Sequence, residues 1–269
     1  GIMSFDIDPV AFRLFGINIY WYALIIVAGM LLGIYFAKKE LVRRGFDEDF
    51  IYDTLFVIIP IGILGARFWY VLFEWDYYSQ NPGQILNIRG GGLAIHGGII
   101  FGALALYFYC KKHLVPFLDM TDILTPSLAL GQGIGRWGNF MNQEAHGGPT
   151  DLPWGIIIDG QKVHPTFLYE SIGDVIIFLI LINAIKRNPD KGKVTASYLI
   201  GYGILRYFVE GLRTDSLYWG PFRTAQLISI LFVVGGVILF IYANKKNLPP
   251  YFKPKKQVKE KEANIIRFK

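Results

Sequence analysis

Seven long apolar stretches run along the chain, separated by short polar segments. A hydrocarbon core about 30 Å thick needs about 20 apolar residues of helix to cross it. Three stretches meet this without a formal charge: Ile17–Ala37, Gly91–Cys110 and Thr224–Asn244. Four more are shorter or carry charged residues: Ile51–Phe73, Asp119–Phe140, Thr166–Lys186 and Val194–Arg213. The pattern predicts an all-α integral membrane protein with seven transmembrane helices; the alternative is that one or two weak stretches are re-entrant.

The basic residues are distributed unevenly between the two sides of these stretches. Most of the 27 Lys and Arg residues follow the first, third and fifth stretches or lie in the tail 245–269. The other side holds Arg13, Arg89, Lys162, Arg213 and Arg223. Because Lys and Arg are retained in cytoplasmic loops, we expect the N-terminus outside and the C-terminus in the cytoplasm.

The outer boundary is also marked by aromatic residues and by a turn. All six tryptophans fall near or beyond the outer ends of the stretches: Trp21, Trp69, Trp75, Trp137, Trp154 and Trp219. Trp favours the membrane interface. Asp159-Gly160 follows an apolar run and predicts a hairpin in a small extracytoplasmic β-containing segment, 141–165, between the fourth and fifth helices.

The domain organisation follows from these assignments. No internal repeat is present, so we expect one seven-helix membrane domain over 1–250 and a basic cytoplasmic tail over 251–269. No basic segment precedes the first apolar run, so we expect no cleaved signal peptide.

Composition agrees with a membrane protein. The 269 residues are 53% hydrophobic and 18% charged, whereas soluble domains carry about 25% charged residues. This excludes a disordered chain, a coiled coil and a disulfide scaffold, and the single Cys110 has no internal disulfide partner. The net charge of +6 indicates lipid headgroups and topology rather than nucleic acid.

Ionisable residues inside spans are costly and therefore mark candidate functional sites. His96 lies at the outer start of the third stretch, Arg67 in the outer part of the second, and Tyr20 and Tyr22 at the start of the first. The outer end of the fourth carries Arg136, Asn139, Asn142 and Glu144. Spacing of i, i+4, i+8 and i+11 puts one face of the sixth helix together: Tyr202, Arg206, Glu210 and Arg213.

Structural alternatives exist for several of these residues. His96 on its own fits a packed core histidine, and Arg206–Glu210 fits an i,i+4 ion pair. Arg67 and Arg213 fit side chains that snorkel to headgroups. Other charges divide into two groups. Asp53, Asp122 and Lys186 are inner-boundary charges without a special role, whereas Glu170 and Asp174 are buried acids suited to pairing with a membrane arginine.

Polar and charged residues from three predicted helices lie at one depth, and this convergence favours a catalytic site over the structural alternatives. Arginine presents a planar fork of donors that matches phosphate, so Arg136 and Arg206 at one depth indicate an anionic phospholipid site. Histidine is suited to move a proton near neutral pH, which makes His96 the candidate for proton transfer. Of the other histidines, we expect His146 and His164 in the outer segment and His113 in an inner loop.

The segment Gly135-Arg-Trp-Gly-Asn-Phe-Met-Asn-Gln-Glu-Ala-His-Gly147 closely resembles the signature of the bacterial prolipoprotein diacylglyceryl transferases. All fixed positions of Gly-Arg-x-Gly-Asn-Phe-x-Asn-x-Glu-x-x-Gly are met. The resemblance continues, over nearly the whole chain, in Tyr20-Trp-Tyr22, His96-Gly-Gly98, His164-Pro-Thr-Phe-Leu-Tyr-Glu170 and Arg206-Tyr-Phe-Val-Glu-Gly-Leu-Arg213. One departure is Phe167, where many relatives carry Gln.

The resemblance implies an enzyme of the bacterial cytoplasmic membrane whose active site faces outward. It implies transfer of the diacylglyceryl group of phosphatidylglycerol to the lipobox cysteine of a preprolipoprotein, with release of glycerol 1-phosphate. The implied catalytic residues are His96, Arg206, Arg136 and Tyr22. The implied lipid-binding residues are Arg136, Arg206, Asn139, Glu144, Asn142, Gly147, Glu210 and Arg213. The partners are the lipid, the signal peptide and the bilayer, with no nucleic acid and no cofactor.

Two questions stay open at this level. His96 either accepts the thiol proton or orients the headgroup. Other classes of membrane protein fit less well. A secondary transporter should show an internal repeat, and a retinal-type receptor needs a lysine in the seventh span; the sequence has neither. An intramembrane serine protease needs a serine beside its histidine, whereas Ser127 lies toward the inner half, far from His96. The runner-up is a non-catalytic lipid-binding scaffold. No metal motif is present, since the chain has neither His-Glu-x-x-His nor paired cysteines.

Overall fold

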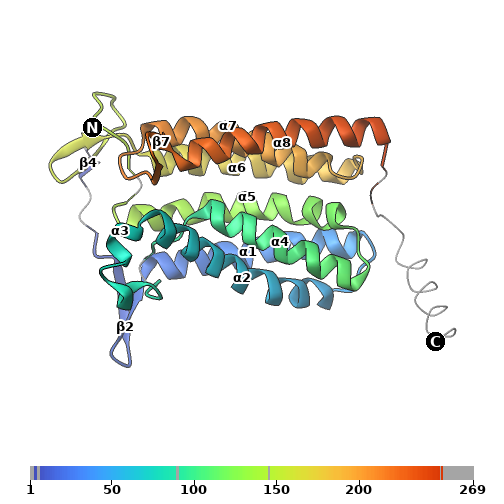
Figure 1. The fold of residues 1–269 in the computed structure, drawn as a ribbon, viewed down its shortest axis with the longest axis horizontal. Coiled ribbons are helices and arrows are strands. Elements are labelled where there is room, and N and C mark those ends of the chain that lie inside the picture. Colours follow the sequence, from blue (N-terminus) through green and yellow to red (C-terminus); the bar gives the residue numbers. More distant parts are fainter. Residues whose placement is uncertain (1–2, 5–6, 89–90, 145, 249, 251–269) are drawn as a thin grey trace.

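The long helices of the computed structural model lie side by side along one axis (Figure 1). The structure describes residues 3–4, 7–88, 91–144, 146–248 and 250; the tail 251–269 and Arg89, both used above, lie outside this range. The described residues form seven helices of at least 19 residues: α1 (Trp21–Arg43), α2 (Asp49–Phe73), α4 (Ile95–His113), α5 (Phe117–Met141), α6 (Thr166–Ala184), α7 (Lys193–Leu212) and α8 (Thr224–Lys246). Three short helices are α3 (Trp75–Tyr78), η1 (Pro82–Gln84) and η2 (Ile185–Arg187).

Four of the described helices are long and apolar enough to cross a membrane: α1, α2, α6 continued by η2, and α8. The expected membrane protein is thus confirmed at this coarser level. Each predicted stretch overlaps one long helix. Helices α5 and α7 carry charged residues in their interiors, such as Arg136 and Arg206, which lower their mean hydropathy.

Short strands gather at one end of the bundle, at the left in Figure 1. They are β1 (Met3–Ser4), β2 (Val10–Leu14), β3 (Ile17–Tyr20), β4 (Ile156–Ile158), β5 (Gln161–Val163), β6 (Tyr218–Trp219) and β7 (Phe222–Arg223). The order β1-β4-β5 forms a small sheet with β1 parallel to β4, while β2–β3 and β6–β7 are hairpins. We refer to this end as the strand end.

The predicted hairpin in the segment 141–165 is confirmed. Strands β4 and β5 pair antiparallel, with Ile156 opposite Val163. Asp159 and Gly160, between them, have φ of 53° and 77°. Positive φ at both central residues is the requirement of a two-residue type I′ turn, which Asp-Gly favours.

Two predicted helix starts were wrong. Residues Ile17–Tyr20 form β3 instead of the first turn of a helix, because Phe15 and Gly16 take positive φ and turn the chain back onto β2. Tyr20 therefore lies in a strand, and α1 begins at Trp21. The third stretch starts its helix at Ile95, since Gly91 has a positive φ that right-handed helix excludes.

Helix α5 is the most buried of the long helices and lies between two groups. It packs on α1 on one side and on α6 on the other, while α2 packs on α4 and α7 on α8. The α7–α8 contact is close because both helices carry glycine there. A Cβ at Gly203 would lie 2.8 Å from the Ser229 carbonyl oxygen, and one at Gly236 would lie 2.9 Å from that of Ala196. Small residues let helix backbones approach in this way.

A buried polar group joins α1, α5 and the start of α7 at the end opposite the strands. Arg44 contacts Glu40 at 2.9 Å and Asp119 at 3.2 Å. Asp122 accepts hydrogen bonds from the backbone N–H of Gly192 at 2.8 Å and of Thr195 at 2.9 Å. The prediction that Asp122 has no special role was wrong, because it caps the first turn of α7.

Candidate active site

Glu170 joins three helices at the centre of the candidate site. Its Oε2 accepts a hydrogen bond from Arg206 Nη1 at 2.6 Å and from Arg136 Nη1 at 3.4 Å. Its Oε1 accepts one from the Tyr202 hydroxyl at 3.3 Å. The carboxylate is 2% exposed, so its charge is stabilised by the two guanidinium groups instead of by water. The expectation that Glu170 pairs with a membrane arginine is confirmed, and α5, α6 and α7 meet at this residue.

The charged face of α7 continues toward the strand end. Arg206 Nη2 lies 3.0 Å from Glu210 Oε2, and Arg213 Nη1 lies 3.3 Å from the same oxygen. The predicted common face of these residues is confirmed. Arg206 both makes the i,i+4 pair and bridges to α6, so the pair is one part of a larger network.

Both arginines retain unused donors. Arg136 Nε and Arg206 Nε are buried and have no hydrogen-bond partner in the described part of the chain. A guanidinium carries five N–H donors, and a buried donor without an acceptor is unfavourable. Two arginines from two helices, both bound to one carboxylate, thus each keep an unsatisfied donor.

His96 lies on the first turn of α4 and is 4% exposed. Its ring centroid lies 6.1 Å from that of Tyr202 and 5.6 Å from that of Phe232. Its Nε2 is buried and lacks a hydrogen-bond partner among the residues described. His96 is thus brought next to the Glu170 network through Tyr202, with one ring nitrogen left for another group.

A second polar cluster follows the end of α5. Asn139 Nδ2 donates to Glu144 Oε1 at 3.0 Å, and Asn142 Nδ2 donates to the same oxygen at 3.4 Å. Burial raises the pKa of the Glu144 carboxyl above its ordinary value, and these hydrogen bonds act in the opposite direction. We call Asn139, Asn142 and Glu144 the amide cluster.

Gly147 occupies a tight crossing of two segments. Its N–H donates to the His164 carbonyl at 2.8 Å, and it forms a bridge to Arg213. A Cβ here would lie 2.5 Å from His164 Cβ and 2.9 Å from the Leu212 carbonyl oxygen. The residue joins the strand end of α7 to the segment that precedes α6, a role in packing.

Tyr22 is 8% exposed and packs against the signature glycine of α5. A Cβ at Gly138 would lie 2.8 Å from Tyr22 Cδ2. Tyr22 therefore lies against the helix that carries Arg136 and Asn139.

Three residues differ from what the sequence suggested or go beyond it. Arg67 does not snorkel, because it is 5% exposed and donates to the carbonyls of Gln84, Ile85 and Gly92. Phe167 packs in the core, stacked on Phe140 at 4.5 Å. Asp174 is fully buried, and neither of its carboxylate oxygens has a hydrogen-bond partner within the described ranges.

The described residues include no group of three or more His, Cys, Asp or Glu side chains placed to hold a metal ion. The ligand chemistry of the site is instead that of guanidinium, amide and carboxylate groups.

The fold and this site define a helical membrane protein with a buried, multiply charged cluster toward the strand end of its bundle. Residues 9–242 match the family model described as prolipoprotein diacylglyceryl transferase. The chain belongs to this family.

Curated relatives cover the chain almost completely. Two proteins named phosphatidylglycerol–prolipoprotein diacylglyceryl transferase, from Finegoldia magna and Clostridioides difficile, are 55% and 53% identical over 240 residues, covering 89% of this chain and 97% of each relative. One of the same name from Staphylococcus aureus is 47% identical over 266 residues, covering 94% of both.

Proposed function

We propose that this protein transfers the diacylglyceryl group of phosphatidylglycerol to the cysteine thiol of a prolipoprotein lipobox. The reaction forms a thioether and releases glycerol 1-phosphate, as the first step of lipoprotein maturation. One observation carries the proposal beyond family membership: Arg136 and Arg206 converge on Glu170 with unused, buried N–H donors.

The two arginines are proposed to bind the phosphodiester of the lipid. In the reaction the thiol sulfur attacks the glyceryl carbon, and the bond between that carbon and the phosphate oxygen breaks. The electron pair goes to the phosphate, so negative charge grows there in the transition state. Donors fixed beforehand by Glu170 stabilise that charge without reorganising.

His96 is proposed to accept the thiol proton. Only the thiolate is a strong nucleophile, and an unperturbed thiol has a pKa of about 8.5. An unpartnered Nε2 beside Tyr202 supports this role, and it supports a headgroup contact equally well. In the second case the arginine charges lower the pKa of the thiol.

The remaining assigned residues are proposed to hold the headgroup. The amide cluster presents hydrogen-bonding groups to the glycerol hydroxyls, and Tyr22 packs against Gly138 on the helix that carries Asn139 and Arg136. Glu210 and Arg213 support Arg206, and Gly147 fixes the end of α7 beside them.

We further propose seven membrane spans, formed by α1, α2, α4, α5, α6, α7 and α8, with the strand end outside. The asymmetry of Lys and Arg supports an outer N-terminus and a cytoplasmic C-terminus. This orientation puts the site toward the extracytoplasmic face of a bacterial inner membrane. Residues 1–250 then form the membrane domain and 251–269 a cytoplasmic tail.

One assay separates this enzyme from a lipid-binding scaffold. Purified protein is incubated with phosphatidylglycerol and a lipobox peptide, and the products are analysed by mass spectrometry. The proposal predicts a peptide heavier by one diacylglyceryl group together with free glycerol 1-phosphate. Lipid binding without any modified peptide contradicts it.

A further inference from the structure

A polar cavity of about 280 Å³ lies beside α2 and α3, apart from the ionic network. Its lining includes four tyrosines, one arginine and one exposed asparagine: Tyr20, Tyr70, Tyr77, Tyr78, Arg67 and Asn87. We call it the tyrosine pocket. Its volume lies just below the range of about 300–1,000 Å³ that is typical of small-ligand sites.

Arg67 brings to this pocket a positive charge that makes no ion pair among the described residues. Nε, Nη1 and Nη2 each donate at 2.8 Å to a backbone carbonyl, which uses three of the five N–H groups. Among the residues that the structure describes, no carboxylate oxygen lies within 4.0 Å of its nitrogens. The guanidinium carbon lies instead 5.0 Å from the Tyr78 ring centroid and 5.7 Å from that of Tyr70.

A purely structural cross-link accounts for the three carbonyl bonds but leaves a buried positive charge facing a cavity. Burying a charge without a counterion is costly. The charge and the two remaining N–H groups therefore favour an anion in the pocket. The tyrosine hydroxyls and the Asn87 amide around it favour a ligand with hydroxyl groups of its own.

Gly91 and Gly92 connect this pocket to the amide cluster. Both line the pocket and have positive φ, of 119° and 73°. A Cβ at Gly91 would lie 3.1 Å from Glu144 Oε1, and one at Gly92 would lie 2.2 Å from Arg67 Nη1. Two residues without side chains therefore lie where the tyrosine pocket meets the amide cluster.

We propose that the tyrosine pocket is a second binding site for a glycerophosphate group, whose phosphate contacts Arg67 and whose hydroxyls contact the tyrosines and Asn87. The inference rests on the proposed function, which supplies this group in two forms. One is the headgroup of the incoming lipid, and the other is the free product that leaves the arginines.

Binding of free sn-glycerol 1-phosphate tests the proposal without requiring transfer. Saturation transfer from aromatic protein protons to the glycerol protons is measured by NMR on the whole protein in detergent. The pocket variant is Tyr77→Phe with Asn87→Ala; both side chains are exposed, so folding is retained. Arg67 stays intact because it donates to the carbonyls of Gln84, Ile85 and Gly92. Tyr242→Phe is the matched control, because Tyr242 lies near the C-terminal end of α8, away from the pocket.

The pocket variant is expected to bind about tenfold more weakly, since it loses hydrogen bonds to the ligand. The control, and an Arg136→Gln variant that impairs the first site, are expected to retain binding at the pocket. Undiminished affinity in the pocket variant overturns the proposal. So does displacement of the probe by inorganic phosphate as strongly as by deuterated glycerol 1-phosphate, because the hydroxyls then contribute nothing.

Lipid nanodiscs distinguish the two sources of the group. If the lipid headgroup occupies the pocket, phosphatidylglycerol discs lower probe binding relative to phosphatidylcholine discs. If the free product is the ligand, binding is equal in both; either result supports the site. Absence of peptide modification in the transfer assay contradicts the proposed function and leaves this binding result unaffected.

Discussion

Glu170 and Arg206 face each other across the α6–α7 contact, with 2.6 Å between Oε2 and Nη1. The same oxygen accepts from Arg136 on α5, so one carboxylate fixes the spacing of two guanidinium groups. The residue that positions the proposed phosphate ligands is thus an acid, remote from the 135–147 signature in the chain.

Replacing Glu170 by Gln is expected to impair both turnover and stability. Breaking a buried pair by removing one partner costs about 3–5 kcal/mol, since an uncompensated charge remains. We expect kcat/KM for diacylglyceryl transfer to fall by at least about 100-fold and the thermal midpoint to fall with it. Glu48→Gln, at an exposed pair with Lys38, is the control. Unchanged kinetics in Glu170→Gln contradict the positioning role.

Arg136→Lys and Arg206→Lys test the planar fork. Lysine keeps the positive charge but loses bidentate geometry, so each variant should lose about 10- to 100-fold in kcat/KM. Turnover is followed by mass spectrometry of the modified peptide. Near-normal rates in both variants would remove these arginines from phosphate binding.

His96→Gln separates a base from a headgroup ligand. Glutamine can hydrogen-bond but cannot accept the thiol proton at neutral pH, so we expect a loss of about 100-fold or more while phosphatidylglycerol still binds. Raising the pH toward about 8.5 should partly restore the rate, because thiolate then forms without help. The rate–pH profile and lipid binding are measured together. A variant that fails to bind the lipid assigns His96 to the headgroup.

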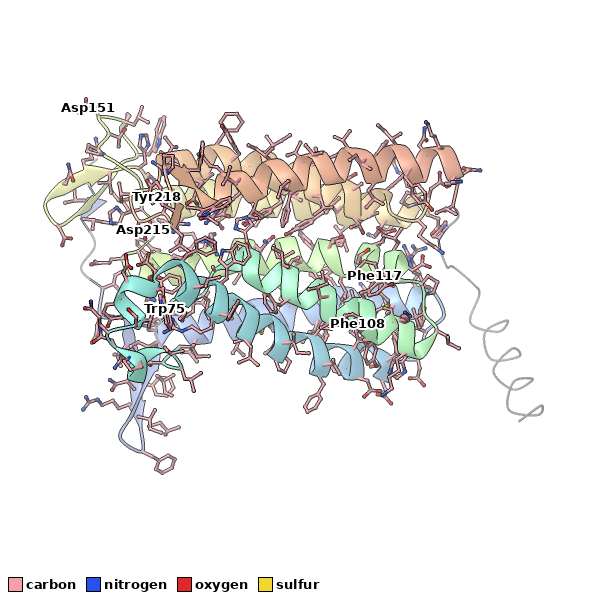
Figure 2. All side chains as sticks on the ribbon, viewed as in Figure 1. Trp75, Phe108, Phe117, Asp151, Asp215 and Tyr218 are labelled. Carbon is pink, nitrogen blue, oxygen red and sulfur yellow. The ribbon has the colours of Figure 1, made fainter. Side chains whose placement is uncertain are left out.

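Single cysteines test the orientation of the bundle. Asp151 lies at the strand end, where Figure 2 labels it, and Lys246 lies at the opposite end of the last helix. In a Cys110→Ala background, a membrane-impermeant thiol reagent added to intact cells should label Asp151→Cys and not Lys246→Cys. Permeabilised cells, in which both are labelled, provide the control. Labelling of Lys246→Cys alone in intact cells reverses the topology.

Gly147→Ala tests the crossing between α7 and the segment before α6. The added methyl group meets His164 Cβ at 2.5 Å, so we expect a loss of about 1–3 kcal/mol from overpacking. Gly102→Ala is the matched control, since a Cβ there has no neighbour within 4 Å among the described residues. Thermal unfolding of both variants is compared. Equal midpoints contradict the tight crossing.

Sequence reasoning located the helices and the charged face of α7 because both depend on local spacing. Hydropathy gave the seven long helices, and the 3.6-residue period brought Arg206 and Glu210 together. It missed the β2–β3 hairpin because an apolar strand of four residues leading into a helix reads as one continuous apolar run.

Long-range partners were the second limit. The sequence places Asp122 at the membrane boundary because the N–H groups that donate to its carboxylate lie about 70 residues away, at Gly192 and Thr195. Arg67 was assigned to headgroups because nothing local marks three carbonyl acceptors. The one local signal is the pair Gly91-Gly92, which leaves room for the Arg67 side chain to approach the backbone.

The cap that Asp122 makes on α7 has a mechanical consequence. Helix α7 is a stiff rod that rises about 1.5 Å per residue, so Arg206 stands about 16 Å above the turn that Asp122 holds. Fixing the first turn of α7 therefore fixes the position of the Arg206 guanidinium along the axis of the bundle. If the proposed site and orientation hold, the depth at which a lipid phosphate meets Arg206 is therefore set by Asp122, at the end of the bundle opposite the strands.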